Sequence, residues 1–215
     1  MKISRWSLVF FLAGPLGAAE PIAPDLTTLG RTNAGWELPR FPSLGQSANS
    51  DRPNSITAGA TTGAYVAGVE LAEGTIEFEA RGRAADGSSF VGVMFHGVDG
   101  TTYDGVYFRS FNFGHDNPVK RDHAVQYIAM PEWPWHRLRR ERPEEFENPV
   151  TPTPKPDEWF RARVVVEEGR VRVFVNDATE PSLEVERLST RGRGKVGLWV
   201  TGFGDIANLK ITPKS

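Results

Sequence analysis

Short segments in which apolar and polar residues alternate recur along most of the chain, and this period of two predicts β-strands. The clearest run holds three of them, at 90–96, 103–109 and 123–128. Successive side chains of a strand point to opposite faces of a sheet. Val91 and Phe95 therefore share one face of the first strand, and we assign that face to the core.

The same pattern predicts strands elsewhere. Segments 64–71 and 74–80 flank a short Ala-Glu-Gly turn and predict a hairpin, in which Ile76 and Phe78 point inward. Later strands are expected at 160–166, 170–176, 182–188, 195–200 and 207–212.

One stretch, residues 131–147, departs from the strand pattern and predicts about two helical turns, with Pro134 near their start. The prolines between residues 149 and 156 then predict an extended return path. About nine to twelve short strands, one short helical insertion and turns rich in Gly and Pro predict an all-β fold, a two-sheet sandwich.

The first residues have a different character. Lys2 and Arg5 precede an apolar run at 8–13, and the small residues Gly17 and Ala19 suit cleavage by a signal peptidase. That run is shorter than the ~20 residues that span a membrane. We expect a signal peptide at 1–19, an irregular N-terminal wrapping segment at 20–55 and the sandwich domain at 56–215, with no stable membrane span after cleavage.

Net charge and cysteine content exclude some kinds of partner and chemistry. Cleavage after Ala19 removes Lys2 and Arg5, so 23 of the 25 basic residues remain against 27 acidic ones, a net charge of −4. This charge predicts no nucleic-acid partner, because nucleic acid and anionic lipid attract basic surfaces. The absence of cysteine excludes a disulfide framework and a thiol nucleophile. Export without disulfides favours a bacterial protein that is secreted or periplasmic.

Polar side chains of several kinds face away from the expected core. By strand parity, His96, Tyr107, Arg109 and Gln126 share one solvent-facing surface of three neighbouring strands. An imidazole, a phenol, a guanidinium and an amide can together bind a ligand, and Asn112 would add a donor and an acceptor. A salt bridge to a nearby aspartate explains the arginine equally well.

Two tryptophans, Trp133 and Trp135, lie in the Pro-rich segment after the third strand. Flat aromatic side chains at the rim of a sandwich stack on the apolar C–H faces of sugar rings. Alternatively, one of the two plugs the end of the sandwich. The basic residues at 136–142 are interleaved with glutamates, which favours a self-neutralised surface helix over a polyanion site. If the cluster binds a ligand, sulfated or uronic glycans are the natural candidates.

Six segments together carry a family resemblance. They are Gly74-Thr-Ile-Glu-Phe-Glu-Ala, Phe90-Val-Gly-Val-Met-Phe-His, Trp159-Phe-Arg-Ala-Arg-Val-Val-Val, Val173-Phe-Val-Asn, Gly194-Lys-Val-Gly-Leu-Trp-Val and Ala207-Asn-Leu-Lys-Ile. With them, the chain from about Ala64 to Thr212 resembles the concanavalin A-like lectin/glucanase superfamily. Within it, the chain is most similar to bacterial exported family-16-like glycoside hydrolase or 3-keto-disaccharide hydrolase domains. The resemblance implies a jelly roll with one concave sheet and leaves the chemistry open, because the superfamily holds hydrolases, lyases and binding modules alike.

The sequence departs from these relatives where their catalytic acids stand. Family-16 glucanases carry Glu-x-Asp-x-x-Glu on one strand, and this chain has no such run. The 3-keto-sugar relatives carry Glu-x-Gln in the third strand of the concave sheet. Here Ala124-Val-Gln126 stands in that place, so the glutamine is kept and the acid is missing. A mechanism driven by carboxylates therefore loses its support.

Two further kinds of site are candidates. Three of the four histidines lie within one short segment, at His96, His115 and His123. They are candidate general bases or metal ligands, although their spacing matches no metal motif. His123 has the parity opposite to Gln126 unless a bulge shifts it. Asp205 stands where lectin-like sandwiches carry a structural Ca²⁺, with a turn residue as the simpler explanation. No other cofactor is expected.

Three functions stay open at this point. The first is an exported carbohydrate-recognising protein whose glycan cleft is floored by the polar residues of the sheet and walled by the loop of Trp133 and Trp135, with an oligosaccharide or polysaccharide as partner. The second is a glycoside hydrolase or lyase that acts on a glycoside, with a 3-keto sugar as the attractive substrate; His96 or His123 would be the base, and Arg109 would polarise a carbonyl or carboxylate. The third is a non-catalytic structural protein of the envelope.

Overall fold

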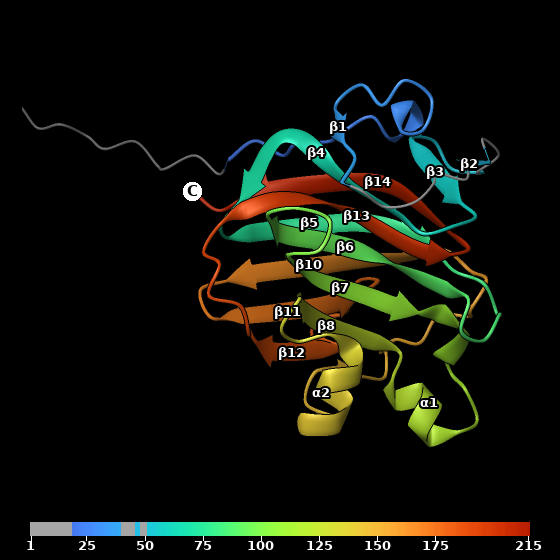
Figure 1. The fold of residues 1–215 in the computed structure, drawn as a ribbon. Coiled ribbons are helices and arrows are strands. Elements are labelled where there is room, and N and C mark those ends of the chain that lie inside the picture. Colours follow the sequence, from blue (N-terminus) through green and yellow to red (C-terminus); the bar gives the residue numbers. More distant parts are fainter. Residues whose placement is uncertain (1–18, 40–45, 48–50) are drawn as a thin grey trace, which may run out of the picture.

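Two seven-stranded antiparallel sheets pack against each other in the computed structural model, which describes residues 19–39, 46–47 and 51–215 (Figure 1). Sheet I has the order β1 (Trp36–Glu37), β4 (Thr62–Leu71), β13 (Gly194–Gly202), β6 (Ser89–Gly97), β7 (Tyr103–Arg109), β8 (Val125–Met130), β9 (Glu147–Asn148). Sheet II has the order β12 (Leu183–Glu186), β11 (Arg170–Val175), β10 (Phe160–Glu167), β5 (Gly74–Arg81), β14 (Gly204–Pro213), β3 (Ser55–Ala58), β2 (Gln46–Ser47). This confirms the two-sheet sandwich.

The core fills the space between the sheets, as the alternation along the strands requires. In β5 the side chains of Ile76 and Phe78 are buried while those of Glu77 and Glu79 are not. Phe78 meets Phe108 of sheet I with ring centroids 6.4 Å apart, and such aromatic pairs stabilise a core beyond their buried area.

The segment at 20–55 contacts the sandwich at several points. Its described elements are η1 (Leu26–Thr28), β1 and β2. Trp36 pairs with Val66 of β4, and Ile22 forms a bridge with Ile211 of β14. The expected signal peptide at 1–19 lies, except for Ala19, outside the described residues.

Three short helical elements lie beside sheet I: η2 (Ser110–Asn112), α1 (Pro118–Asp122) and α2 (Trp135–Glu141). Helix α2 forms in the segment expected to be helical. Helix α1 was not expected, although Asn117 caps it and Pro118 occupies its first turn, as helix starts favour. Because α1 continues to Asp122, strand β8 begins at Val125 and not at residue 123.

Both α-helices lie at the β8–β9 edge of sheet I (Figure 1), and α2 contacts β8. They stand beside the outer face of the sheet, which points away from sheet II. Within the described ranges, no helix has the length and apolar character needed to cross a membrane.

Candidate functional site

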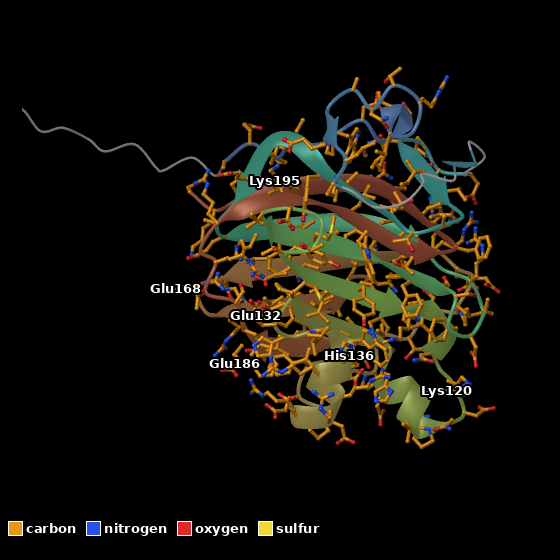
Figure 2. The ribbon with its side chains drawn as sticks, in the orientation of Figure 1. Lys120, Glu132, His136, Glu168, Glu186 and Lys195 are labelled. Carbon is orange, nitrogen blue, oxygen red and sulfur yellow. The ribbon has the colours of Figure 1, made fainter. Side chains whose placement is uncertain are left out.

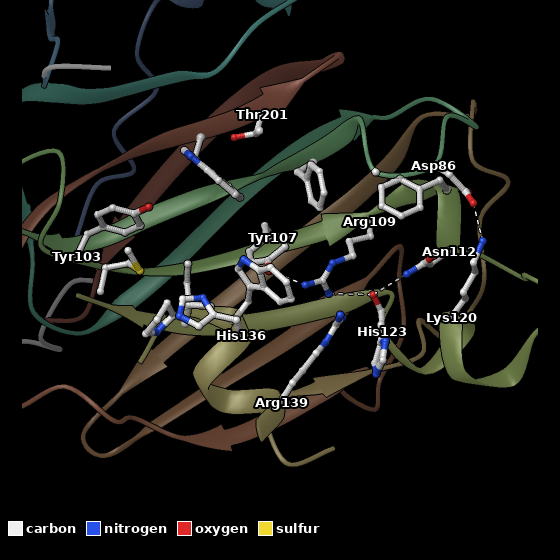
Figure 3. Close-up of a pocket in the computed structure, with 18 residues that line it drawn as sticks. Asp86, Tyr103, Tyr107, Arg109, Asn112, Lys120, His123, His136, Arg139 and Thr201 are labelled. Atoms are coloured by element: carbon white, nitrogen blue, oxygen red, sulfur yellow. Dashed lines mark hydrogen bonds and ion pairs between the residues drawn. The ribbon is translucent and has the colours of Figure 1, made fainter. Parts of the chain in front are cut away.

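A cavity of about 630 Å³ lies over the outer face of sheet I (Figure 3). Strands β6, β7, β8 and β13 supply its floor, while η2, α1 and α2 supply its walls. Figure 2 shows Lys120 on α1 and His136 on α2 on the same side of the molecule. The cavity is therefore a groove between the sheet and its two short helices, and we call it the pocket.

Aromatic side chains dominate the pocket lining. Sheet pairing aligns Trp199 of β13, Gly92 of β6 and Tyr107 of β7 in one row across the sheet. Because Gly92 has no side chain, the rings of Trp199 and Tyr107 meet above it at 5.0 Å between centroids. The aromatic residues of the lining are Phe90, Tyr103, Tyr107, Phe111, Trp135 and Trp199.

Arg109 organises the polar part of the floor (Figure 3). Its guanidinium donates to the Tyr107 hydroxyl (2.6 Å), to Gln126 Oε1 and to the backbone carbonyl oxygen of His123 (3.0 Å). The Tyr107 hydroxyl in turn donates to Gln126 Oε1 at 2.7 Å. Burial lowers the pKa of Arg109 from its usual value and raises that of Tyr107 to about 12, so the phenol stays protonated at neutral pH.

Glu147 of β9 lies behind this floor and holds three cationic or protonatable groups. Its carboxylate is 3.3 Å from Arg109 Nη1, 2.9 Å from Arg139 Nη2 and 3.2 Å from His123 Nε2. Glu147 is 4% exposed, so this is a buried ion cluster. Sequence reasoning missed it, because β9 is only two residues long and gives no strand pattern.

His123 lies beside the pocket through α1, not through strand parity. It caps the C-terminus of α1, and its backbone carbonyl oxygen accepts from Asn112 Nδ2 at 3.1 Å. Burial lowers the pKa of its imidazole more than Glu147 raises it, which favours the neutral ring at pH 7. The neutral ring can accept a proton.

Two buried amide groups of the site have an unpaired atom. Asn112 is 4% exposed and lines the pocket, and its Oδ1 has no hydrogen-bond partner. Gln126 is fully buried beneath Tyr107 and Arg109, and its Nε2 is likewise unpaired. Buried polar atoms are paired in most native structures, so Asn112 Oδ1 is an acceptor that a ligand can use.

The structure therefore brings together most of the expected site residues. Tyr107, Arg109, Asn112, His123 and Gln126 form one hydrogen-bonded group. Trp135 lines the same pocket, with 49% of its surface exposed. The expectation that Tyr107, Arg109 and Gln126 face solvent is wrong, because all three side chains are buried beneath the pocket.

The expectation that His96 shares this face is wrong. The backbone of His96 adopts φ +48° next to a bulge in the β6–β13 pairing, which reverses the expected side-chain direction. The imidazole is fully buried, with Nδ1 3.2 Å from Asp104 and Nε2 2.8 Å from the carbonyl oxygen of Ala72. It lines no part of the pocket.

Trp133 also lies outside the pocket lining. It packs against the core and carries the Arg137 guanidinium 4.1 Å from its ring centre. Of the two tryptophans, only Trp135 is thus placed to meet a ligand in the pocket. Most arginines of α2 pair locally, as expected of a self-neutralised helix, whereas Arg139 points to Glu147 and lines the pocket.

The surroundings of Asp205 do not fit a calcium ion. Its carboxylate accepts from Thr57 at 2.5 Å, from Arg81 at 2.7 Å and from Arg83 at 3.0 Å. Two guanidinium groups would repel a divalent cation, which needs several oxygen ligands. In the part of the chain that the structure describes, no group of three or more acidic, histidine or cysteine side chains could hold a metal.

Fold and site together define a two-sheet jelly roll with an aromatic pocket on one sheet. No protein-family model matches the chain, and no curated protein matches it in sequence. Among solved structures, carbohydrate-binding module CBM66 from Bacillus subtilis is similar in fold, with a TM-score of 0.56, 13% identity and coverage of 84% of this chain and 96% of that one.

Two further solved structures have the same general fold. A candidate glycosyl hydrolase from Parabacteroides distasonis gives a TM-score of 0.54 at 12% identity, covering 85% of this chain and 89% of that chain. The exoplasmic/lumenal domain of VIP36, bound to Ca²⁺ and Man3GlcNAc, gives 0.55 at 10% identity, covering 85% and 86%. These likenesses show a shared two-sheet β-sandwich fold and agree with the expected jelly roll.

Proposed function

We propose that this protein is an exported carbohydrate-binding protein that holds an oligosaccharide in the pocket over sheet I. The observation that carries the proposal is the combination of exposed aromatic rings with a buried polar floor. Trp135 and Trp199 offer apolar faces on which a sugar ring can stack, while Arg109 and Asn112 supply polar groups that fix its orientation. The sugar-bound state of a structural neighbour supports the proposal by analogy of fold alone.

The acids of the pocket favour binding over hydrolysis. Glycosidases use two carboxyl groups about 5–9.5 Å apart on either side of the scissile bond. Asp86 is the one acidic residue among those described as lining the pocket, and it pairs with Lys120 at the rim. Glu147 lies behind Arg109 and Arg139 and is engaged by both. The pocket thus offers no pair of free carboxylates, in keeping with the absent glucanase motif.

Glycan-array screening followed by calorimetric titration tests the proposal. Trp135→Ala removes the most exposed ring of the pocket, and we expect Kd to rise about 2- to 12-fold, the equivalent of ~0.5–1.5 kcal/mol for an aromatic contact. Trp159→Ala is the matched control, because Trp159 lies before β10 of sheet II and outside the pocket. Failure to bind any glycan, or equal losses in both variants, contradicts the proposal.

A second candidate, elimination from a 3-keto glycoside, is favoured by the state of His123. Its Nε2 faces Glu147, so a proton held there leaves Nδ1 as a base. The base would take a proton from the carbon next to the ketone, the electron pair would form a C=C bond, and the glycosidic C–O bond would break with protonation of the departing oxygen. Mass spectrometry of 3-keto disaccharides incubated with the protein tests this. Turnover that His123→Gln abolishes supports the enzyme, and no turnover rejects it.

A further inference from the structure

The charges around Glu147 do not balance. One carboxylate is shared by two guanidinium groups, those of Arg109 and Arg139. Among the described residues, no second carboxylate forms an ion pair with either arginine. Lys120 at the rim is neutralised by Asp86. Asp122, at the end of α1, acts electrostatically on His123, but it is exposed to solvent and does not line the pocket.

A comparison within the same chain shows that this imbalance is local. Buried Asp205 is likewise held by two arginines, Arg81 and Arg83. There, however, Arg81 also pairs with Asp51, so two cations face two anions. At Glu147 two cations face one anion. Because the low dielectric of a buried site strengthens electrostatic interactions, the excess positive charge favours an anionic partner from outside.

The pocket also offers unsatisfied groups at this position. Arg139 uses Nε and Nη2 to bind Glu147, while no group of the described residues forms a hydrogen bond with its Nη1. Its guanidinium carbon lies 5.3 Å from the ring centre of Trp135. Because this guanidinium lies over the Trp135 ring, a sugar ring that packs against the uncovered surface of Trp135 would have the guanidinium of Arg139 close to its edge. Asn112 Oδ1, buried and unpaired in the same lining, is available to a hydroxyl group.

Building on the function proposed above, we propose that the ligand is an acidic sugar, a ring that carries a carboxylate as in a hexuronic acid. The carboxylate binds Arg139 and supplies the second anion that Arg109 and Arg139 lack, while the ring stacks on Trp135. A ring hydroxyl donates to Asn112 Oδ1. A planar carboxylate suits a guanidinium, whose N–H groups form a fork of matching geometry.

The test compares oligosaccharides of the same ring configuration that do or do not carry a charged carboxylate. Calorimetric titrations use trigalacturonic acid, its methyl ester and the neutral galactose trisaccharide, all at one ionic strength. We expect the acid to bind about tenfold more tightly than the ester, as for a hydrogen bond to a charged group. In the wild type, added salt should weaken binding of the acid and leave binding of the ester nearly unchanged.

Two variants on helix α2 test which arginine causes the preference for the charged ligand. Arg139→Gln should reduce the ratio of acid to ester affinity to about one, since it removes the charged hydrogen-bond donor. Arg140→Gln is the matched control, because Arg140 pairs with Glu141 and faces solvent, and it should keep the wild-type ratio. If Arg139→Gln fails to fold, the salt dependence and the ester comparison on the wild type still show whether the protein prefers the charged ligand.

The outcomes separate this inference from the proposed function. Equal binding of acid, ester and neutral sugar, with a loss in Trp135→Ala, overturns the acidic ligand and leaves carbohydrate binding standing. Binding of a sulfated galactose oligosaccharide with no binding of the carboxylated one also overturns it. Binding of no glycan at all refutes both proposals.

Discussion

Glu147→Gln is the most informative single change in the pocket, because one buried carboxylate stabilises three neighbours. The substitution keeps the size of the side chain and one acceptor oxygen while it removes the negative charge. Arg139 is 30% exposed at its side chain and can turn toward solvent. Arg109, whose side chain is 6% exposed, cannot, so it is left as a buried cation without a counter-ion.

The expected loss in the free energy of unfolding follows from the burial of Arg109. Removing one partner of a buried ion pair destabilises a protein by about 3–5 kcal/mol. Because glutamine keeps one hydrogen bond and Arg139 can relax, we expect a loss near the lower end, ~3 kcal/mol. For a chain of this size, each kcal/mol lowers Tm by about 2–4 °C, so Tm should fall by roughly 6–12 °C.

Urea denaturation, with m-values compared to confirm an unchanged unfolding transition, measures the loss. Glu141→Gln is the control, since Glu141 pairs with Arg137 and Arg140 on the surface and its removal should cost less than ~1 kcal/mol. The double variant Arg109→Gln/Glu147→Gln should lose less than the sum of its single changes, because both remove the same interaction. A loss in Glu147→Gln no larger than in Glu141→Gln refutes the account of Arg109 as a buried cation held by Glu147.

Three further predictions concern the pH profile, the floor of the pocket and the corrected position of His96. Because burial lowers the pKa of His123 in the folded protein, the unfolded chain takes up a proton first as pH falls through about 6.5, so the free energy of unfolding should decrease there. Urea titrations from pH 7.5 to 5 should show that this free energy depends less on pH in His123→Gln. Gly92→Ala would place Cβ 2.1 Å from the Val106 carbonyl oxygen and should cost about 3 kcal/mol or more, whereas Gly192→Ala, with nothing within 4 Å, should be nearly neutral in the same assay. His96→Ala should lower stability by about 2–3 kcal/mol through its lost partners yet leave glycan affinity within twofold, and a larger loss of affinity would show that His96 acts on the pocket.

The strands were predictable because period-two alternation sets both their position and their buried face. Segments expected at 74–80 and 160–166 are β5 and β10, nearly to the residue. The exception is instructive. At His96 a positive φ and a bulge reverse the side chain, and the positive φ falls on the histidine and not on the neighbouring Gly97, where the sequence would favour it.

The site was predictable only where it lies within consecutive strands. Tyr107, Arg109 and Gln126 belong to the neighbours β7 and β8, so parity alone places them together. Trp199 belongs to β13, which pairs with β6 although more than ninety residues separate them, and only the strand order of the folded sheet brings it to Tyr107. Glu147 and Arg139 become neighbours through the fold of a short helix and a two-residue strand. The helix was expected from the sequence, but the strand has no pattern of its own, so the pairing of Glu147 with Arg139 was not predictable.

The pocket differs from the other buried ionic sites of the described chain in what it leaves unsatisfied. Asp104 binds His96, Ser189 and Arg191 with both of its oxygens, and Asp205 is similarly enclosed by protein groups. Each of these buried carboxylates is thus paired with arginine, although Nε of Arg191 beside Asp104 has no hydrogen-bond partner of its own. Around Glu147, by contrast, one positive charge lacks an anion and the buried oxygen of Asn112 lacks a donor. Because the unbalanced positive charge and the unpaired oxygen lie beside exposed aromatic rings, the acidic sugar proposed above would supply both missing partners at once.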